Sequence, residues 1–240
     1  MERVYPVRSN VPPVSALRGA TTLQMITAEA VSSASSRVPR PRVRRLGLSD
    51  YEVTWRAMRE LTASRTAATP DEIWVLQHPA VYTLGVAGRS EHLPRVSSSI
   101  PIVRTDRGGQ VTYHGPGQLV IYLLLDMRRR GLAVRPLVRV MERAVINLLA
   151  DYGIAAVGRT EAPGVYVSGS KVAALGLRVR NGCCYHGIAF NVDMDLAPFH
   201  AIDPCGYPGL AVTQARDLGI ATPAERLGDE LVEQLLKLLP

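Results

Sequence analysis

Two residue types that could make and break covalent bonds stand in separate turns of this 240-residue chain. Cys205 lies in DPCGYPG, whose glycines and prolines predict an exposed, shaped turn. A cysteine attacks as its thiolate, which needs a positive neighbour or a base beside it. Lys171 directly follows another turn, SGS, and is one of only two lysines in the chain. A lysine withdrawn from water beside a thiol can accept and return its proton, although a solvated lysine at a strand end is the alternative.

The glycine-rich segment 107–118, RGGQVTYHGPGQ, is the second candidate feature, because it places an arginine and a histidine among four glycines and a proline. Glycine lets the backbone approach a ligand closely, and binding groups concentrate in such loops. We expect a binding site here, the alternative being a turn that holds no ligand. His114 in this loop and His186 further on each precede a glycine. Either could be a base, a pocket wall or a structural residue.

The three cysteines are an odd number without CxxC spacing, so we expect neither a disulfide nor a zinc site. The expected compartment is therefore reducing and cytoplasmic. Cys183 and Cys184 follow the Asn181-Gly182 turn and enter a strand. We expect both of these thiols to pack in the interior rather than to react.

The net charge of +7 is concentrated in residues 1–45, which carry +6 and leave +1 for the other 195 residues. A nearly neutral folded part argues against a nucleic-acid-binding module, which needs clustered basic residues. One run, Arg128, Arg129 and Arg130, could be a solvated turn or could dock an acidic protein partner. No apolar run approaches the roughly 20 residues of a membrane span, so we expect no membrane role.

The chain is expected to divide into an extension and one domain. Residues 1–41 are rich in arginine, serine and proline, and we expect them to be a disordered N-terminal extension. A transit peptide and a mis-assigned start codon are the alternatives to an ordinary flexible tail. Residues 42–240 are expected to form a single catalytic domain.

The local patterns predict an α+β fold, with a mixed, largely antiparallel sheet flanked by helices. Capping boxes at Ser49/Glu52 and Thr222/Glu225 predict the starts of two helices, which end near residues 65 and 239. Three- and four-residue spacing of apolar residues predicts a further helix over 135–152. Strands are expected at 43–48, 72–77, 80–84, 100–104, 119–125, 164–168, 171–180 and 185–192. The nucleotide-binding signatures GxGxxG and GxxxxGK[ST] are absent from the sequence in the required context.

A series of ordered motifs resembles the lipoyl(octanoyl) transferases, the octanoyl-acyl-carrier-protein:protein N-octanoyltransferases. The resemblance covers nearly all of residues 43–220. The motifs are QHPAVYTLG at 77–85, RGGQVTYHGPGQ at 107–118, APGVYV at 162–167, KVAALGLRVR at 171–180, HGIAFNVDMDL at 186–196 and PCGYPG at 204–209.

This resemblance implies a fold like the catalytic domain of biotin and lipoate protein ligases. It also implies Cys205 as the acyl-carrying nucleophile, Lys171 as its partner, and neither a cofactor nor a metal. The substrate-binding residues that it implies are Arg107, Gly108, Gly109, Gln110, Val111, Thr112, Tyr113, His114, Ala174, Leu175, Gly176, Gly187, Ile188 and Ala189.

The implied reaction moves an octanoyl group from octanoyl-acyl carrier protein, through a thioester on Cys205, to a lysine of the acceptor. The implied acceptors are the lipoyl domains of 2-oxoacid dehydrogenase complexes and the glycine cleavage H protein, with neither nucleic acid nor a membrane as a partner. Lys171 would carry the protons, and bulky residues at Gly176 or Ala189 would shorten the acyl chain accepted. Two rivals stay open, an ATP-dependent lipoate or biotin ligase and a cysteine hydrolase that releases free acid.

Overall fold

The computed structural model describes residues 38–89, 92–94, 99–160, 162–203 and 209–240, and the structural statements below concern these residues. Residues 37–240 form one compact unit. Apart from residues 38–41, the predicted extension lies outside the described part of the chain, and so does Cys205.

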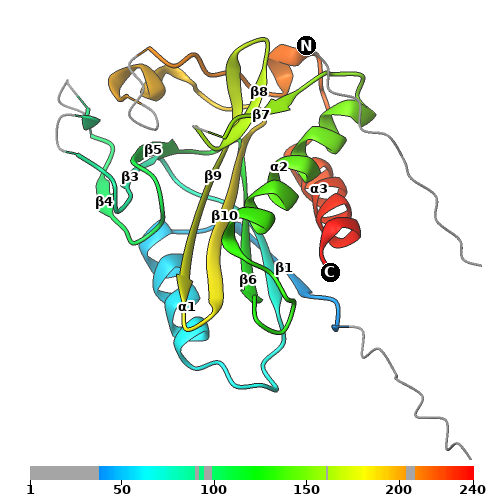
Figure 1. Cartoon of the computed structure of the whole chain (residues 1–240). Coiled ribbons are helices and arrows are strands. Elements are labelled where there is room, and N and C mark those ends of the chain that lie inside the picture. The colour runs from blue at the N-terminus through cyan, green and yellow to red at the C-terminus, as the bar shows by residue number, and fades with distance from the viewer. Residues whose placement is uncertain (1–37, 90–91, 95–98, 161, 204–208) are drawn as a thin grey trace, which may run out of the picture. The chain divides into compact units, whose positions relative to one another are not determined.

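A seven-stranded sheet organises the unit (Figure 1), and its spatial order is β1-β2-β6-β10-β9-β8-β7. Only β1 and β2 run parallel, and every other neighbouring pair in this sheet is antiparallel. The expected mixed, largely antiparallel sheet is therefore confirmed. Its strands are β1 (Arg42–Leu48), β2 (Glu72–Gln77), β6 (Gln118–Asp126), β7 (Val157–Gly158), β8 (Gly164–Val167), β9 (Ser170–Arg180) and β10 (Cys183–Asn191).

Helices cover both faces of this sheet because the central strand β6 is apolar on both sides. Its odd-numbered residues from Leu119 to Leu125 pack in the larger core, under α2 (Val134–Asp151) and α3 (Ala224–Leu238). Its even-numbered residues Val120, Tyr122 and Leu124 face a second core under α1 (Tyr51–Ala63). Figure 1 shows α2 and α3 side by side and α1 apart from them. None of the helices in the described ranges has both the length and the hydropathy that a membrane span requires.

Both predicted capping boxes are wrong. The side chain of Asp50, not Ser49, accepts the N–H of Val53 and caps α1, because two suitable acceptors are adjacent and only one can occupy the N-cap position. At α3 the N-cap is Pro223, and no side chain caps this helix. The sequence pattern found the two helices but not their first residues.

The glycine-rich segment contains a strand that the pattern did not predict. Residues Val111–His114 form β5, which pairs with β3 (Val81–Leu84) in a second, three-stranded sheet. The remaining strand of this sheet is β4 (Ile102–Arg104), which runs parallel to β3. A third cluster of buried apolar residues fills the space behind it. The small sheet thereby fixes the glycine-rich loop against the main sheet.

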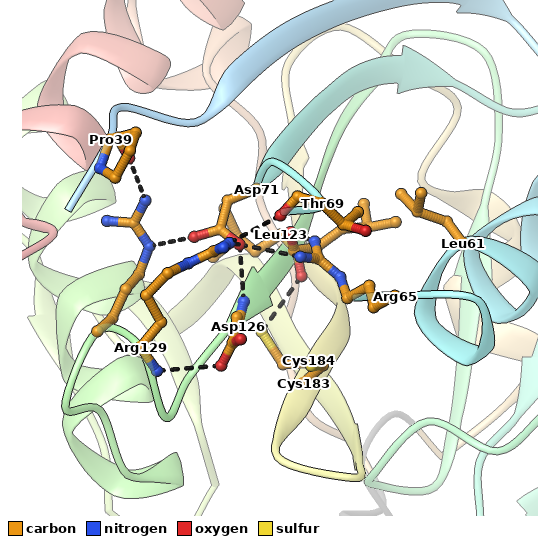
Figure 2. A network of polar contacts seen from close by, with 12 residues as sticks. Pro39, Leu61, Arg65, Thr69, Asp71, Leu123, Asp126, Arg129, Cys183 and Cys184 are labelled. Carbon is orange, nitrogen blue, oxygen red and sulfur yellow. Dashed lines mark hydrogen bonds and ion pairs between the residues drawn. The ribbon is translucent and has the colours of Figure 1, made fainter. Parts of the chain in front are cut away.

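The arginine run 128–130 lies in a turn, but only Arg128 is exposed there. Arg129 and Arg130 each place a guanidinium nitrogen 2.6 Å from the carboxylate of Asp71, whose side chain is only 1% exposed. Arg65 adds a third contact to the same carboxylate at 3.1 Å, as Figure 2 shows. Removing one member of such a buried ionic group costs about 3–5 kcal/mol, because the remaining charge is left buried without its partner.

Candidate active site

A narrow pocket lies between the main sheet and the glycine-rich loop. The space between its walls, open solvent included, is about 520 Å³. The cavity itself is only about 50 Å³, well below the roughly 300–1,000 Å³ of typical small-molecule sites. The shape is therefore that of a slot. Its walls are formed by Tyr51, Arg107, Gly109, Gln110, Val111, Thr112, His114, Val120, Tyr122, Ala174, Leu175, Gly176, His186, Gly187, Ile188 and Ala189.

Small residues on two neighbouring strands make one wall of the slot. Gly176 of β9 lies opposite Gly187 of β10, and Ala174 lies opposite Ala189. The two pairs are two residues apart along each strand, so they lie on the same face of the sheet. The short side chains of Ala174 and Ala189 form a shallow trough beside the glycine pair. The glycines themselves let other backbone approach, because a Cβ at Gly187 would lie 2.2 Å from the carbonyl oxygen of Ile121 and one at Gly176 would lie 3.3 Å from that of Gly108.

Arg107 shapes the loop instead of presenting its charge to solvent. Its side chain is buried, and its guanidinium donates to the carbonyl oxygen of Thr83 at 2.6 Å and to that of Gln110 at 2.7 Å. The backbone N–H of Gly108 donates to the carbonyl oxygen of Leu177 on β9 at 2.9 Å. These bonds satisfy backbone groups that a tight loop would otherwise leave unpaired, and they hold the loop over the trough.

Buried histidines and tyrosines form the polar end of the pocket region. His78 donates from Nδ1 to the carbonyl oxygen of Ser49 at 2.6 Å and accepts the hydroxyl of Tyr122 at 2.7 Å. Burial lowers the pKa of His78 to about 4 and holds the pKa of His114 well below its ordinary value. Nδ1 of His114 donates to the side-chain oxygen of Gln118 at 2.7 Å. Both imidazoles are therefore neutral near pH 7. For His114, which also lines the slot, this agrees with the structural residue and the pocket wall among the alternatives.

His186 differs from these because it faces a carboxylate. Its Nε2 lies 3.3 Å from Asp106, which also accepts hydrogen bonds from Tyr185 and Trp55. Burial raises the pKa of Asp106, but these hydrogen bonds outweigh burial and lower it overall. Burial lowers the pKa of His186. Its Nδ1 and the side-chain oxygen of Gln110 are buried without a partner among the described residues, and both residues line the slot. A ligand or water in the slot would satisfy both atoms.

Lys171 is buried beside the slot, and both its backbone and its side chain make contacts with other segments. Its backbone N–H donates to Ala211 at 2.8 Å, and its carbonyl oxygen accepts from Thr213 at 2.9 Å. Its ammonium lies 3.4 Å from the carbonyl oxygen of Pro163 and 5.2 Å from the ring centroid of Tyr166. Residues 211–213, which follow Cys205 in the sequence, therefore pair with the backbone of Lys171.

Gly164 links this lysine to the trough. It lies opposite Ala174 in the β8–β9 pairing. A Cβ added at Gly164 would lie 2.8 Å from the backbone carbonyl oxygen of Ala173, 2.9 Å from Cε of Lys171 and 3.3 Å from its ammonium nitrogen. Lys171 therefore packs against Gly164 at the Ala174 end of the trough. Any larger residue at position 164 would have to displace its neighbours.

The predicted substrate-binding residues divide into two groups. Twelve of the fourteen line the slot, whereas Gly108 and Tyr113 do not. Tyr113 packs against Tyr82 at a tilt and against Phe199 edge to face, in the cluster behind the small sheet. Lys171 adjoins the slot without lining it, and Cys205 lies outside the described residues.

The other two cysteines are poor nucleophiles. Burial raises the pKa of Cys183 and raises that of Cys184 to about 12, and both side chains are buried. A thiol that stays protonated at neutral pH reacts slowly. The sequence-based expectation that both pack in the interior is confirmed.

Sequence reasoning missed three residues of the slot, Tyr51, Val120 and Tyr122. Tyr51 opens α1, and the other two lie on the α1 side of β6. No local pattern distinguishes them from core residues, because the crossing of a helix over a sheet brings them to the pocket.

Comparison with known proteins identifies relatives of the whole described unit. The family described as Lipoyl protein ligase A/B catalytic domain matches residues 50–235. The chain is 60% identical over 199 residues to the octanoyltransferase of Dechloromonas aromatica, which covers 83% of this chain and 97% of that protein.

Solved structures share the fold at low sequence identity. The structure of lipoate-protein ligase A bound with ATP matches with a TM-score of 0.70 and 16% identity, covering 83% of this chain and 85% of that one. Biotin protein ligase from Aquifex aeolicus matches with a TM-score of 0.50 and 12% identity, covering 83% of this chain and 69% of that one. The expected likeness to biotin and lipoate ligases in fold is thus confirmed.

Proposed function

Because this chain belongs to the lipoyl protein ligase A/B catalytic-domain family and is an enzyme of its octanoyltransferase group, we propose that it transfers an octanoyl group from octanoyl-acyl carrier protein to lipoyl domains. The acyl group passes through a thioester on Cys205. The acceptor lysines belong to the lipoyl domains of 2-oxoacid dehydrogenase complexes and to the glycine cleavage H protein.

The observation that carries this proposal is a narrow trough of glycine and alanine that ends beside a buried lysine. The short side chains of Ala174 and Ala189 leave space for an alkyl chain, and Gly164 joins the end of this space to Lys171. An apolar slot stabilises an acyl chain by about 0.8 kcal/mol for each buried methylene. A buried amine at one end of the slot is placed to exchange protons with groups that react there.

The proposed first half-reaction forms the thioester on the enzyme. The amine of Lys171 accepts the proton of the Cys205 thiol, and the thiolate attacks the carbonyl carbon of the incoming thioester. The bond from that carbon to the pantetheine sulfur then breaks, and the ammonium of Lys171 returns the proton to the leaving sulfur. One thioester replaces another, so this step needs little free energy and no nucleotide.

The second half-reaction reuses the same lysine. Lys171 accepts a proton from the attacking amine of the acceptor lysine, and an amide bond forms as the Cys205 sulfur leaves. The pairing of Lys171 with Ala211 and Thr213 supports this scheme, since it ties the lysine to the chain that follows Cys205. The high pKa values of the Cys183 and Cys184 thiols also favour Cys205 as the nucleophile.

Transfer without ATP tests the proposal against both rivals. The purified protein is mixed with octanoyl-acyl carrier protein and an unmodified lipoyl domain, and the domain is then weighed by mass spectrometry. We expect an octanoyl amide on the domain in the absence of ATP, and none from free octanoate. Modification that requires ATP and free octanoate would identify a ligase instead, and release of free octanoate with an unmodified domain would identify a hydrolase.

A further inference from the structure

His186 reaches the slot through an uncommon backbone conformation. It lies within β10 with a φ of 66°, in the left-handed region that few residues other than glycine adopt. Cys184 and Ile188 on the same strand pack in the larger core, and regular alternation would turn His186 toward that core as well. Instead its ring meets the ring of Tyr122 edge to face and lines the slot, on the α1 side of the sheet. The pairing of β10 with β6 is interrupted at residues 185 and 186. Backbone strain of this kind concentrates at functional positions.

The hydrogen bonds of Asp106 decide which nitrogen of His186 carries the proton. Burial raises the pKa of Asp106, but hydrogen bonds from His186, Tyr185 and Trp55 outweigh burial and lower it overall. Asp106 is therefore an ionised carboxylate near pH 7, which can only accept hydrogen bonds. Nε2 of His186, 3.3 Å away, must be the donor. Burial lowers the pKa of His186, so the imidazole is neutral and its Nδ1 keeps a lone pair.

Two buried acceptors thus face the same end of the slot. Nδ1 of His186 and Oε1 of Gln110 have no donor among the described residues, and both residues line the slot. His186 lies opposite Leu177 on β9. The carbonyl oxygen of Leu177 accepts the N–H of Gly108, so the glycine-rich loop crosses the slot at this level, two residues before Gln110. A buried acceptor without a donor costs free energy, so this end of the slot suits a group that donates.

This polar end lies about one acyl chain away from Lys171. The side chain of Lys171 packs against Gly164, which lies opposite Ala174, and Ala174 in turn lies opposite Ala189. From Ala189 to His186 the strand advances by three residues, about 10 Å. The eight carbons of an extended octanoyl group span about 9 Å, because each carbon–carbon bond of about 1.5 Å advances the chain by about 1.25 Å. A chain with its carbonyl group beside Lys171 therefore ends next to His186.

From this arrangement we propose that Nδ1 of His186 and Oε1 of Gln110 form a polar end wall, which sets the length of the acyl chain and selects a hydrogen-bond donor at its far end. The inference rests on the proposed function and adds a substrate class to it, the ω-hydroxyacyl thioesters. With an octanoyl group in the slot, water donates to the end wall. A longer alkyl chain displaces this water and leaves the acceptors unpaired, whereas a terminal hydroxyl donates in its place.

Two donors of equal size test the end wall. Nonanoyl-pantetheine and 8-hydroxyoctanoyl-pantetheine have the same number of non-hydrogen atoms and differ only in a terminal methyl or hydroxyl group. The assay measures kcat/KM for transfer of each acyl group to a lipoyl domain. In the wild type we expect the hydroxyacyl donor to be favoured about threefold or more, since the end wall accepts its hydroxyl. An apolar end would favour the nonanoyl donor instead.

Two variants remove the acceptors one at a time. Gln110→Leu replaces the amide by an apolar group of similar size and keeps the backbone carbonyl that Arg107 binds. We expect the ratio of hydroxyacyl to nonanoyl to fall about fivefold or more. His186→Gly accepts the positive φ without strain and removes Nδ1. We expect decanoyl-pantetheine, about tenfold poorer than octanoyl-pantetheine in the wild type, to become nearly as good a donor in this variant. Ratios cancel any loss that is common to all donors.

Matched controls and a binding measurement separate the possible outcomes. Gln234→Leu on α3 and His200→Gln change the same residue types outside the slot, and we expect wild-type ratios for both. Calorimetry on Cys205→Ala measures binding of the same two thioesters without reaction. A preference for nonanoyl in the wild type, or equal ratios in the wild type and Gln110→Leu, would overturn the end wall while leaving the proposed function intact. A hydroxyl preference in binding by a protein that transfers no acyl group would support the end wall and refute the proposed function.

Discussion

Enlarging Ala189 should shorten the acyl chain that the slot accepts. Ala189 is 6% exposed and lies opposite Ala174 in the trough. Leucine adds three carbon atoms, about the volume of three methylenes of the substrate. Because each buried methylene stabilises by about 0.8 kcal/mol, the octanoyl group should lose about 2.4 kcal/mol. That loss corresponds to about a 60-fold fall in kcat/KM for octanoyl relative to pentanoyl.

The assay compares initial rates for thioesters of pantetheine with acyl chains of four to ten carbons. The ratio of kcat/KM values for two chain lengths cancels any loss of activity that overpacking causes equally for all substrates. Ala189→Gly serves as the opposite control, because it widens the trough and should shift the preference toward longer chains. If a folded Ala189→Leu variant keeps the wild-type ratio of kcat/KM for octanoyl to that for pentanoyl, the acyl chain does not lie in this trough.

Three further substitutions test the fold and the proton-transfer site. In Gly187→Ala the added methyl would lie 2.2 Å from a backbone carbonyl oxygen of β6, so we expect a loss of at least 1–3 kcal/mol in urea unfolding; wild-type stability would refute that close approach. Burial lowers the pKa of His78 from 6.5 to about 4. The neutral imidazole therefore contributes up to about 3 kcal/mol to the free energy of unfolding above pH 6.5, and this contribution is lost as the pH falls toward 4. Urea midpoints should therefore fall less between pH 8 and pH 5 in His78→Gln than in the wild type or in His200→Gln, which changes an exposed histidine; equal falls in all three would count against the buried, neutral His78. Gly164→Ala would place a methyl 2.8 Å from the backbone carbonyl oxygen of Ala173 and 2.9 Å from Cε of Lys171. We expect a lower urea midpoint and, in the folded variant, a kcat at least tenfold lower at an unchanged KM for octanoyl-pantetheine. An unchanged kcat would mean that the position of this lysine does not limit the reaction.

The sequence predicts the sheet well where the backbone pattern is local. In β6 an unbroken apolar run correctly indicated a strand that is buried on both faces. At Asn181-Gly182 both residues have positive φ, 50° and 77°, as the predicted hairpin turn requires. The strand β5 escaped prediction because its four residues lie among glycines, and only pairing with β3 makes them a strand.

Charge was the feature that the sequence predicted least well. Arg129 and Arg130 looked solvated because their partner, Asp71, is nearly sixty residues away in the chain. Side chains that act through tertiary contact cannot be assigned from a linear pattern of charge.

The candidate site was predicted mainly through motifs. Twelve of its expected binding residues line the slot. Their motifs did not indicate that Arg107 holds its own loop in place through hydrogen bonds to the carbonyl oxygens of Thr83 and Gln110. His114, whose role the sequence left open, is a neutral hydrogen-bonded residue held by Gln118. These roles depend on burial and on partners that only the folded chain provides.

The central claim is that Cys205 carries the acyl group, and intact-protein mass spectrometry tests it most directly. The wild-type protein, Cys205→Ala and the double variant Cys183→Ala/Cys184→Ala are each mixed with octanoyl-acyl carrier protein without an acceptor and weighed. We predict one octanoyl adduct, sensitive to hydroxylamine, on the wild type and on the double variant and none on Cys205→Ala. An adduct that persists in Cys205→Ala and disappears from the double variant would contradict the account.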